Sequence, residues 1–244
     1  DDLEYIPDDA TVELTPEHYA DQGVNRYLEV DETLLDLLGF WVADGSCSAR
    51  NGVRLAMGQS NQQYIDKYRD AFEHVFGIRG TYYGSDDRVG GLKLLNRVAA
   101  LTWGQVLGAD ADSAGEKSIP DIVFNAPPRG QRAFLRGYLL GDGTIVDDKI
   151  TWSTSSRDLA SGLLYLLSAQ GVVASHSVTE ASSIGASTIR GGTVKTQLDS
   201  HRISVSNRSD LQRLRSVWKH HPKGDRLREM VQEGYDNEEK RRYT

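Results

Sequence analysis

Residues 37–45 read Leu-Leu-Gly-Phe-Trp-Val-Ala-Asp-Gly, and residues 135–143 read Leu-Arg-Gly-Tyr-Leu-Leu-Gly-Asp-Gly. Both stretches contain a leading Leu, a glycine, an aromatic residue, two apolar or aromatic positions and a closing Asp-Gly, and their starts lie 98 residues apart. A motif that recurs in this way indicates that one folding unit occurs twice in the chain. The pair therefore predicts two related halves, each opened by the same kind of segment.

Further matched signals follow each copy of the motif in the same order. They are a helix end at a glycine, a helix start at an asparagine and a Lys-x-x-Pro sequence, found at Gly77 and Gly171, Asn96 and Asn207, and residues 117–120 and 219–222. The lysine follows the motif aspartate by 73 residues in the first half and by 77 in the second. An ordered series of matches is harder to obtain by chance than one motif, so we expect the duplication to extend through both halves.

Both copies of the motif lie in segments with helical spacing of apolar residues. The pattern predicts helices over residues 31–43, with Asp31 as the N-cap, and over residues 131–141. Each segment is apolar on nearly every side, which is typical of a buried helix. Gly39 and Gly137 are unfavourable inside a helix, so we expect them to let two backbones approach closely where the helices cross.

Glycines also close the motif, and strand-like segments follow. Gly45 and Gly143 are expected to adopt the left-handed conformation that commonly ends a helix. The expected strands cover residues 52–58, 78–83 and 91–96 in the first half and residues 145–154, 172–179 and 194–206 in the second. Each half then has the order helix, two strands, helix, two strands, helix, which predicts an α+β fold of two αββαββα repeats.

Charge is distributed unevenly along the chain, whose net charge is −7. Residues 1–44 hold 13 acidic residues and one basic residue, whereas the rest of the chain holds 22 acidic and 27 basic residues. The expected divisions are an acidic leader over residues 1–30, a first repeat over 31–127 and a second repeat over 128–244. A basic body is typical of a protein that binds a polyanion, although a charged face is more often only solvated surface.

The composition excludes several other classes of protein. With 39% hydrophobic and 26% charged residues the chain is ordinary for a globular protein. No apolar stretch approaches the roughly 20 residues of a membrane helix, and the acidic start is unlike a signal peptide. Cys47 is the single cysteine, so an internal disulfide and a multi-thiolate zinc site are excluded. We expect a cytoplasmic protein with access to the nucleoid and no membrane association.

The paired motifs resemble those of the LAGLIDADG family, specifically its single-chain, two-repeat homing endonucleases carried within inteins. The resemblance covers roughly residues 31–235. It implies paired central helices related by a pseudo-twofold axis, strands that form DNA-binding saddles, and Mg²⁺- or Mn²⁺-dependent cleavage of both strands of a long duplex DNA target. Val42 and Leu140 replace the earlier acid of the family name, but that position varies in the family and does not indicate loss of activity.

The resemblance also assigns the catalytic and metal-binding residues. Asp44 and Asp142 occupy the family's catalytic acidic position, where they are expected to bind metal. The residues just before them match positions whose backbone carbonyls face the metal, and these are Ala43 and Gly141. Lys117 matches a lysine that family members place before an Ile-Pro, and Lys219 is its second-half partner.

The chemistry of phosphodiester hydrolysis is consistent with these residue types. Carboxylate-bound Mg²⁺ helps to activate water, to neutralise the transition state and to stabilise the leaving oxygen. Two carboxylates at helix C-termini repel each other and the negative helix ends, and a divalent cation would relieve that conflict. Basic residues on or beside the predicted strands and helix starts are candidate DNA contacts: Arg54, Lys93, Arg97, Lys149, Lys195, Arg202 and Arg208.

Other interpretations of the same residues stay open. A single Asp-Gly after a helix is usually a turn, and a lysine is usually solvated, so the repeat supports the two aspartates more strongly than the two lysines. An alternative function is a nucleic-acid-binding maturase or regulator on the same fold without cleavage. A third interpretation, a structural domain that connects intein halves, predicts no affinity for DNA.

The ends of the chain lack the residues that a self-splicing intein requires. The chain starts with Asp1 and Asp2 rather than Cys or Ser, and it ends at Thr244 rather than at His-Asn. We therefore expect a module that is fused to, or excised from, a splicing domain and does not splice by itself. The resemblance to single-chain, two-repeat members implies a monomer. Twenty Arg against eight Lys, with an excess of acids, resembles the composition of haloarchaeal proteins.

Overall fold

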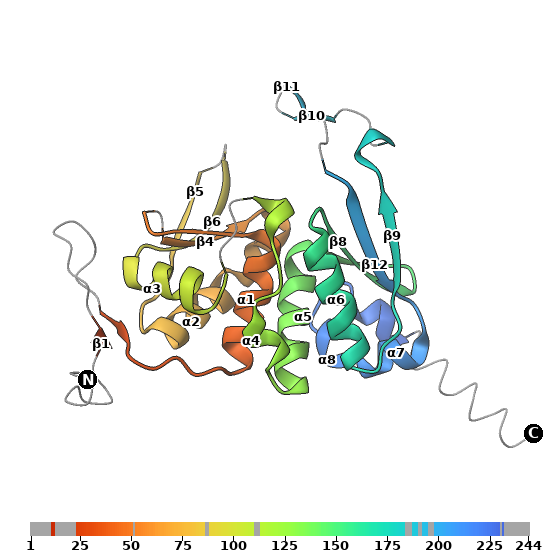
Figure 1. Cartoon of the computed structure of the whole chain (residues 1–244), viewed down its shortest axis with the longest axis horizontal. Coiled ribbons are helices and arrows are strands. Elements are labelled where there is room, and N and C mark those ends of the chain that lie inside the picture. The colour runs from red at the N-terminus through yellow and green to blue at the C-terminus, as the bar shows by residue number, and fades with distance from the viewer. Residues whose placement is uncertain are drawn as a thin grey trace, which may run out of the picture. The chain divides into compact units, whose positions relative to one another are not determined.

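The structure is a computed structural model, and its chain forms two compact units. It describes residues 11–12, 23–50, 52–85, 88–109, 113–183, 187–189, 192–194, 198–229 and 231. The first unit comprises Asp1–Ala111 and Pro120–Gly141, and the second comprises Asp112–Ile119 and Asp142–Thr244. Each unit contains one four-stranded antiparallel sheet and several helices (Figure 1), so the predicted α+β fold is confirmed.

The first unit is built from the motif helix, a sheet and the helices beneath that sheet. Its principal elements are α1 (Glu32–Asp44), β3 (Gly45–Ser48), β4 (Gly52–Met57), α2 (Ile65–Phe76), β5 (Thr81–Ser85), β6 (Arg88–Leu94), α3 (Arg97–Leu101), α4 (Asp121–Phe124) and α5 (Pro128–Asp142, with its last residue assigned to the second unit). Two short strands, β1 (Thr11–Val12) and β2 (Val24–Asn25), pair with each other. A short 3₁₀ helix covers Gln59–Tyr64, and a short π helix covers Thr102–Val106.

The second unit repeats this pattern. Its principal elements are β7 (Gly143–Val146), β8 (Lys149–Thr154), α6 (Arg157–Ala169), β9 (Ser175–Thr179), β12 (Ser200–Val205), α7 (Arg208–Arg213) and α8 (Arg215–Trp218). A small hairpin of β10 (Ser187–Ile189) and β11 (Gly192–Val194) lies between β9 and β12 in the sequence. Short 3₁₀ turns cover Ala114–Glu116 and Ala181–Ser183.

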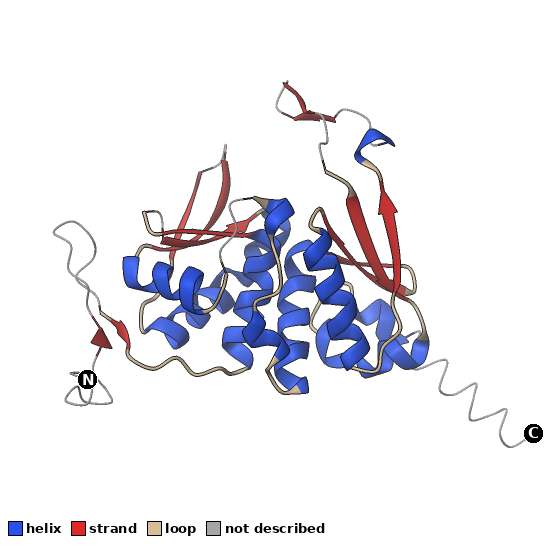
Figure 2. Ribbon diagram, viewed as in Figure 1, coloured by secondary structure: helices blue, strands red, loops and turns tan. Residues whose placement is uncertain are grey.

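The two sheets have the same topology. The strand order is β3-β4-β6-β5 in the first unit and β7-β8-β12-β9 in the second. When the principal strands of each unit are numbered in chain order, both sheets follow the order first, second, fourth, third. In each unit helices pack against one face of the sheet (Figure 2). The predicted order of helices and strands is therefore correct in both halves.

The core explains why the apolar positions form these elements. In α1 every residue from Leu34 to Ala43 is buried, and Trp41 packs edge-on against Trp103 with ring centroids 6.0 Å apart. In the second unit Trp152 on β8 and Trp218 on α8 are fully buried. Burying a large apolar side chain contributes about 1.5–3 kcal/mol. These aromatic residues therefore hold the helices to each sheet.

Several of the predicted boundaries are confirmed by specific contacts. Asp31 caps α1, because its carboxylate accepts hydrogen bonds from the N–H groups of Thr33 and Leu34. The predicted helix ends at Gly77 and Gly171 are also confirmed, and these glycines have φ of 73° and 70°, the left-handed conformation that commonly follows a helix.

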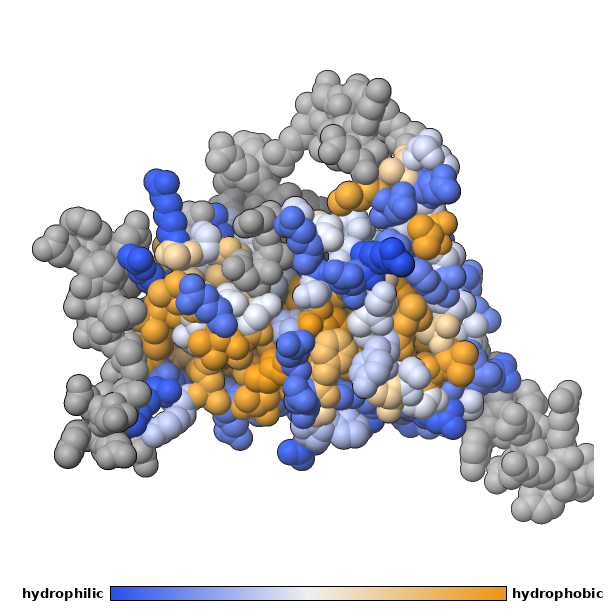
Figure 3. Space-filling view, in the orientation of Figure 1, coloured by the Kyte–Doolittle hydropathy of each residue, from blue (hydrophilic) through white to orange (hydrophobic). Residues whose placement is uncertain are grey.

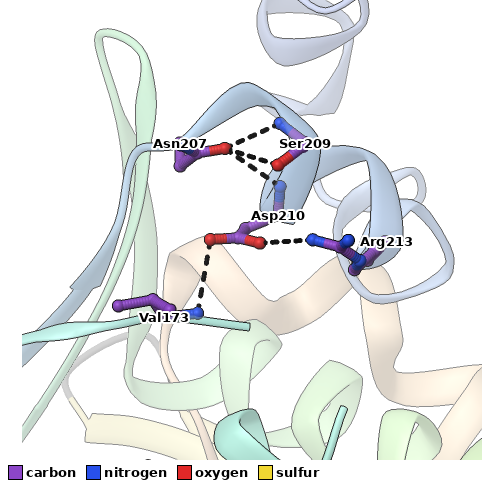
Figure 4. Close-up of polar contacts among 5 residues, drawn as sticks. All are labelled: Val173, Asn207, Ser209, Asp210 and Arg213. Carbon is purple, nitrogen blue, oxygen red and sulfur yellow. Dashed lines mark hydrogen bonds and ion pairs between the residues drawn. The ribbon is translucent and has the colours of Figure 1, made fainter. Parts of the chain in front are cut away.

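The caps of the later helices are also as predicted. The side chain of Asn96 accepts from the N–H of Ala99 at the start of α3. Figure 4 shows the second-half equivalent, in which Asn207 accepts from the backbone of Ser209 and Asp210. The buried carboxylate of Asp210 in turn accepts from the N–H of Val173, just after α6, and from Arg213.

Some local predictions are wrong. Gly45 has φ −108° and ψ 163°, so it is extended, and Gly143 is not among the described residues with positive φ. In both cases the helix passes directly into a strand, and no reversal of the chain is needed. Residues 145–154 form a hairpin rather than one strand, because Asp147, with φ 53°, makes a tight turn. Helix α5 also begins earlier than predicted, since Pro128 is tolerated in a first turn.

The helices are shorter than a membrane span or not apolar enough for one. Within the described residues no helix is long and apolar enough to cross a membrane. On the face seen in Figure 3, apolar residues gather over the helices of the first unit, and hydrophilic residues surround them. One side of α2 is buried, where Tyr68, Phe72 and Phe76 face the core.

Candidate functional site

Helices α1 and α5 cross at the motif glycines. A Cβ atom on Gly39 would collide with the carbonyl oxygen of Phe134, and a Cβ on Gly137 would collide with the carbonyl oxygen of Asp36. Both contacts are to backbone, so no side-chain movement can relieve them. The glycines therefore permit the close approach of the two helices that the sequence predicts.

A buried ion cluster lies at the same crossing. Asp36 on α1 is only 2% exposed, and its carboxylate receives Arg136 Nε at 2.5 Å and Lys67 Nζ at 2.6 Å. Burial and the neighbouring Asp36 charge raise the pKa of Tyr68 well above its ordinary value. Burial lowers the pKa of Lys67, although the nearby Asp36 opposes that effect. The cluster ties α1, α2 and α5 together.

Each motif aspartate is the last residue of its helix. Asp44 ends α1, is half-buried, and accepts a hydrogen bond from Asn61 Nδ2 at 3.2 Å. Asp142 ends α5 and is exposed. The residue before it, Gly141, lies so close to Ala43 that a Cβ would collide with the Ala43 side chain. Asn61 therefore orients one catalytic candidate, a contact that the sequence did not suggest.

The oxygen donors at these helix ends suit a hard divalent cation. A carboxylate and a helix-terminal carbonyl are ligands that Mg²⁺ accepts, and the negative end of a helix dipole favours a cation. In the described part of the chain no group of three or more His, Cys, Asp or Glu is placed to hold a metal ion. Mg²⁺ commonly binds through one or two carboxylates together with water and substrate phosphates. The residues present therefore fit a metal that is completed by phosphate oxygens.

The two candidate lysines differ in their surroundings. Lys117 is half-buried in the second unit, where its carbonyl accepts from Ser156 Oγ at 2.6 Å. Lys219 is exposed and follows α8. Beside it, burial and then the charge of Lys223 lower the pKa of His221 to about 4. His221 is therefore neutral near pH 7, and its Nδ1 accepts the backbone N–H of Lys223.

The open face of the first sheet carries two cations and an aromatic ring. Arg54 on β4 and Lys93 on β6 are direct cross-strand partners. Arg54 Cζ lies 6.0 Å from the ring centroid of Tyr83, and Lys93 Nζ lies 5.8 Å from it. Two of the candidate DNA contacts are thus brought together, and Tyr83, on a predicted strand, is a further member that sequence reasoning missed.

The open face of the second sheet is rich in hydroxyl groups. Arg202 on β12 is flanked by Ser153 and Ser177 on the neighbouring strands, and Thr151 Oγ1 lies 3.2 Å from Ser204 Oγ. The other candidate contacts in the described residues, Lys149, Arg97 and Arg208, are exposed. The last of the candidates, Lys195, lies outside the described residues.

Comparison with known proteins identifies the fold. Residues 129–219 match the model of the LAGLIDADG-like domain. The homing endonuclease I-DmoI, in complex with DNA and Mn, has a TM-score of 0.55 at 13% identity, over 79% of this chain and 99% of that chain. Full-length DUF199/WhiA from Thermatoga maritima has a TM-score of 0.52 at 11% identity, over 85% of this chain and 62% of that chain. At these identities the matches show the fold alone.

Sequence relatives include archaeal DNA polymerases. That of Thermococcus kodakarensis is 31% identical over 156 residues, which is 60% of this chain and 9% of the polymerase. That of Thermococcus hydrothermalis is 28% identical over 157 residues, 61% of this chain and 9% of the polymerase. The chain thus spans less than a tenth of either relative.

These findings confirm the resemblance read from the sequence. The protein has the LAGLIDADG fold that is found in homing endonucleases. It carries a LAGLIDADG-like domain over residues 129–219 and is similar to I-DmoI over nearly the whole length of that enzyme.

Proposed function

We propose that this protein is a homing endonuclease that hydrolyses both strands of a long duplex DNA target with a divalent metal ion. One observation carries the proposal. The motif aspartates, Asp44 and Asp142, each close one of two helices that cross backbone to backbone at Gly39 and Gly137. A protein that only bound DNA would have no need for a duplicated acid at the ends of its central helices.

The two aspartates act as metal ligands, one for each strand of the duplex. Ala43 and Gly141 would add backbone carbonyl oxygens, and Mg²⁺ or Mn²⁺ would supply Lewis acidity and charge neutralisation. Asn61 holds the Asp44 carboxylate by its hydrogen bond, which fixes the direction of the ligand oxygens. The Mn and Ca complexes of I-DmoI support a divalent ion of this kind.

Lysines and sheet residues complete the proposed machinery. Lys117 and Lys219 stabilise phosphate charge or hold the attacking water. The open face of each sheet binds the DNA backbone, through Arg54 and Lys93 in the first unit and through Lys149 and Arg202 in the second. Arg97 and Arg208, each just after a helix cap, add phosphate contacts beside the sheets, and Lys195 adds one between β11 and β12.

The sequence relatives support a proposal for the gene in which this protein is encoded. Similarity to short parts of DNA polymerases supports an element inserted within a polymerase gene, of the intein type. We propose that the chain, from its first repeat (31–127) to its second (128–244), acts as a monomer on the gene that lacks the insertion. A halophilic host remains a prediction from composition, and cleavage that persists in molar KCl would support it.

The test is cleavage of a supercoiled plasmid that carries the uninterrupted insertion region of a polymerase gene. With Mg²⁺ the wild type is expected to give linear DNA, and EDTA is expected to prevent it. Asp44→Asn and Asp142→Asn should each abolish linear product, because Asn loses the charge that holds the metal. Asp148→Asn, which changes an exposed acid in the β7–β8 turn, is the matched control and should cut normally.

The outcomes separate this proposal from its alternatives. Linear product at the wild-type rate from either aspartate variant would remove that residue from the mechanism. Tight binding of the target by a wild type that cuts nothing would favour a maturase or regulator on the same fold. Absence of any DNA affinity would favour a structural domain between the halves of an intein.

A further inference from the structure

Two histidines face each other across strands β9 and β12 of the second sheet (Figure 1). His176 Nε2 lies 3.1 Å from His201 Nδ1, the imidazole planes are 12° apart, and the ring centroids are separated by 5.3 Å. The rings therefore meet edge to edge through their nitrogens, and one nitrogen donates its proton to the other. Neither histidine belongs to the proposed catalytic or DNA-binding groups, so the pair has no role in that machinery.

The pair lies at the margin of the helix-facing side of this sheet. His201 alternates along β12 with the buried residues Ile203 and Val205, and it is itself only 8% exposed. His176 is the direct partner of Ile203, so its side chain shares that face, but it lies on the exposed edge strand β9. An ion that approaches through the exposed ring therefore meets a second, buried ligand.

The fold does not require two histidines at this place. Gly90 and His201 each lie six residues before the asparagine that caps the next helix, and their strands occupy the same place in the two sheets. By the same alignment Tyr82 is the counterpart of His176. The Tyr82 hydroxyl occupies the space that a Cβ on Gly90 would take. One unit thus covers the position with a phenol ring over glycine, and the other with two imidazoles.

The separation of the two imidazole nitrogens suits one metal ion. Zinc lies about 2.0–2.1 Å from an imidazole nitrogen, so two such ligands at angles between square and tetrahedral are about 2.9–3.4 Å apart. The 3.1 Å between His176 Nε2 and His201 Nδ1 falls within that range. When an ion replaces the shared proton, each neutral ring keeps its proton on the nitrogen that faces away, and the rings turn so that both lone pairs meet the ion.

We propose that His176 and His201 form a site for one transition-metal ion of the Zn²⁺, Ni²⁺ or Cu²⁺ class, which bridges the edge strand β9 to β12. Imidazole nitrogen suits these ions, whereas Mg²⁺ prefers oxygen ligands, so Mg²⁺ does not compete. Among the residues that the structure describes, no third His, Cys, Asp or Glu joins the pair, so water fills the remaining coordination positions. The site does not rest on the proposed function, because it needs neither DNA nor the motif aspartates.

The first experiment titrates the DNA-free protein with ZnCl₂ in excess Mg²⁺, which occupies carboxylate sites. Saturable NMR shifts are expected at His176 Nε2 and His201 Nδ1. His176→Gln removes an exposed ligand and should weaken this binding by about 10–100-fold or more, the loss that changes of outer-shell partners already cause. His74→Gln is the matched control, since it removes an exposed histidine of the first unit and should leave the binding unchanged.

The second experiment tests whether the ion joins the two strands. Zn²⁺ at about ten times its dissociation constant should slow hydrogen exchange of the β9–β12 amides by about tenfold, because separation of the strands breaks the site. The edge strand β5 of the first sheet pairs with β6 in the equivalent way and contains no histidine, so its exchange should not change. In His176→Gln, Zn²⁺ should leave the exchange of β9 unchanged as well.

The results decide the site and the proposed function separately. Zn²⁺ shifts at both rings, lost in His176→Gln and accompanied by slower exchange in β9, would support the site. Shifts at one ring only, or equal binding by His176→Gln, would overturn it. Binding without protection of β9 would also overturn it, since the ion would then not join the strands. A protein that binds Zn²⁺ in the expected way but cuts no DNA would refute the endonuclease and leave the metal site intact.

Discussion

The helix-facing side and the open side of the two sheets have diverged to different degrees. At equivalent helix-facing positions both units keep buried apolar residues, such as Leu55 and Trp152, or Leu92 and Ile203. At one open-side pair the residues differ in charge, with Arg54 and Lys93 in the first unit and Thr151 and Ser204 in the second. Burial constrains one side because a polar group there would lose its hydration. The other side has polar residues that keep their hydration or bond each other, so its residues can differ in charge without disturbing the apolar core.

Helices α1 and α5 also combine equivalent positions with positions that differ. Their glycines are equivalent, but position 36 is Asp in the first motif region and its counterpart, 98 residues later, is Phe134. Arg136 likewise corresponds to Leu38. The Asp36–Arg136 pair therefore exists only when α1 meets α5. In a pairing of two α1 helices Asp36 would face Leu38 and would keep only Lys67 as a counter-ion, so the ion pair with Arg136 favours the pairing of α1 with α5.

The largest loss of stability is expected from substitutions of the glycines where α1 and α5 cross. Gly39→Ala and Gly137→Ala should each lower the free energy of unfolding by about 2 kcal/mol or more, because the new methyl group meets a backbone carbonyl. The two losses should be similar, since both glycines serve the same contact. Urea denaturation measures them, with Gly58→Ala, which has open space at its Cβ, as the matched control. A large loss at one glycine only would contradict the equivalence of the helices.

The second-largest effect on stability is expected at the Asp36–Arg136 ion pair, which joins the same two helices. Asp36→Leu should cost about 3 kcal/mol, because Arg136 and Lys67 lose their counter-ion in a partly buried site. The double variant Asp36→Leu, Arg136→Leu restores an apolar contact and should lose much less than the sum of the single changes. A double-mutant cycle in urea gives the coupling energy. Additive losses would mean that the ion pair does not specify how the helices meet.

Much of the fold could be predicted because repetition adds information to weak local signals. The helix caps at Asp31 and Asn207 and the glycines at the crossing follow from local chemistry repeated in two places. The hairpin at Asp147 was missed although Asp147 and Asp148 are residues typical of turns, and only residues 150–154 alternate like a strand. Asn61 and Tyr83 were missed for another reason. They reach Asp44 and Lys93 through the register of the sheet and the path of a loop, and neither is encoded in local spacing.

A smaller effect concerns the hydroxyl pair of the second sheet. Thr151→Val removes the hydrogen bond to Ser204, and it should lower the free energy of unfolding by about 1 kcal/mol. The salt dependence of DNA binding should not change, because no charge is lost. The same variant is therefore the counterpart of Lys93→Gln, which should change the salt slope and spare stability. If Thr151→Val altered the slope, the hydroxyl pair would not be the uncharged counterpart of Arg54 and Lys93.

The smallest expected effect is a change with pH in the stability that the N-caps of two helices contribute. Ser156 caps α6 with a hydroxyl, whereas Asp31 caps α1 with a carboxylate that also bonds His74 Nε2 at 2.7 Å. Burial acts to raise the pKa of Asp31, but hydrogen bonds from Leu34 N–H and His74 outweigh it, so the pKa lies below its ordinary value of 3.8.

An acid whose pKa is lowered by folding adds stability above its unfolded pKa, and that contribution disappears as the pH falls through the folded value. Asp31→Ala should therefore cost about 1 kcal/mol near pH 7, and the difference from wild type should shrink below about pH 4. Ser156→Ala should cost more, because the hydroxyl also donates to the Lys117 carbonyl, but its cost should be the same at every pH, because a hydroxyl does not titrate in this range. Urea unfolding of both variants from pH 7 to pH 3 measures this, and a pH-independent loss in Asp31→Ala would show that its charge does not stabilise the α1 terminus.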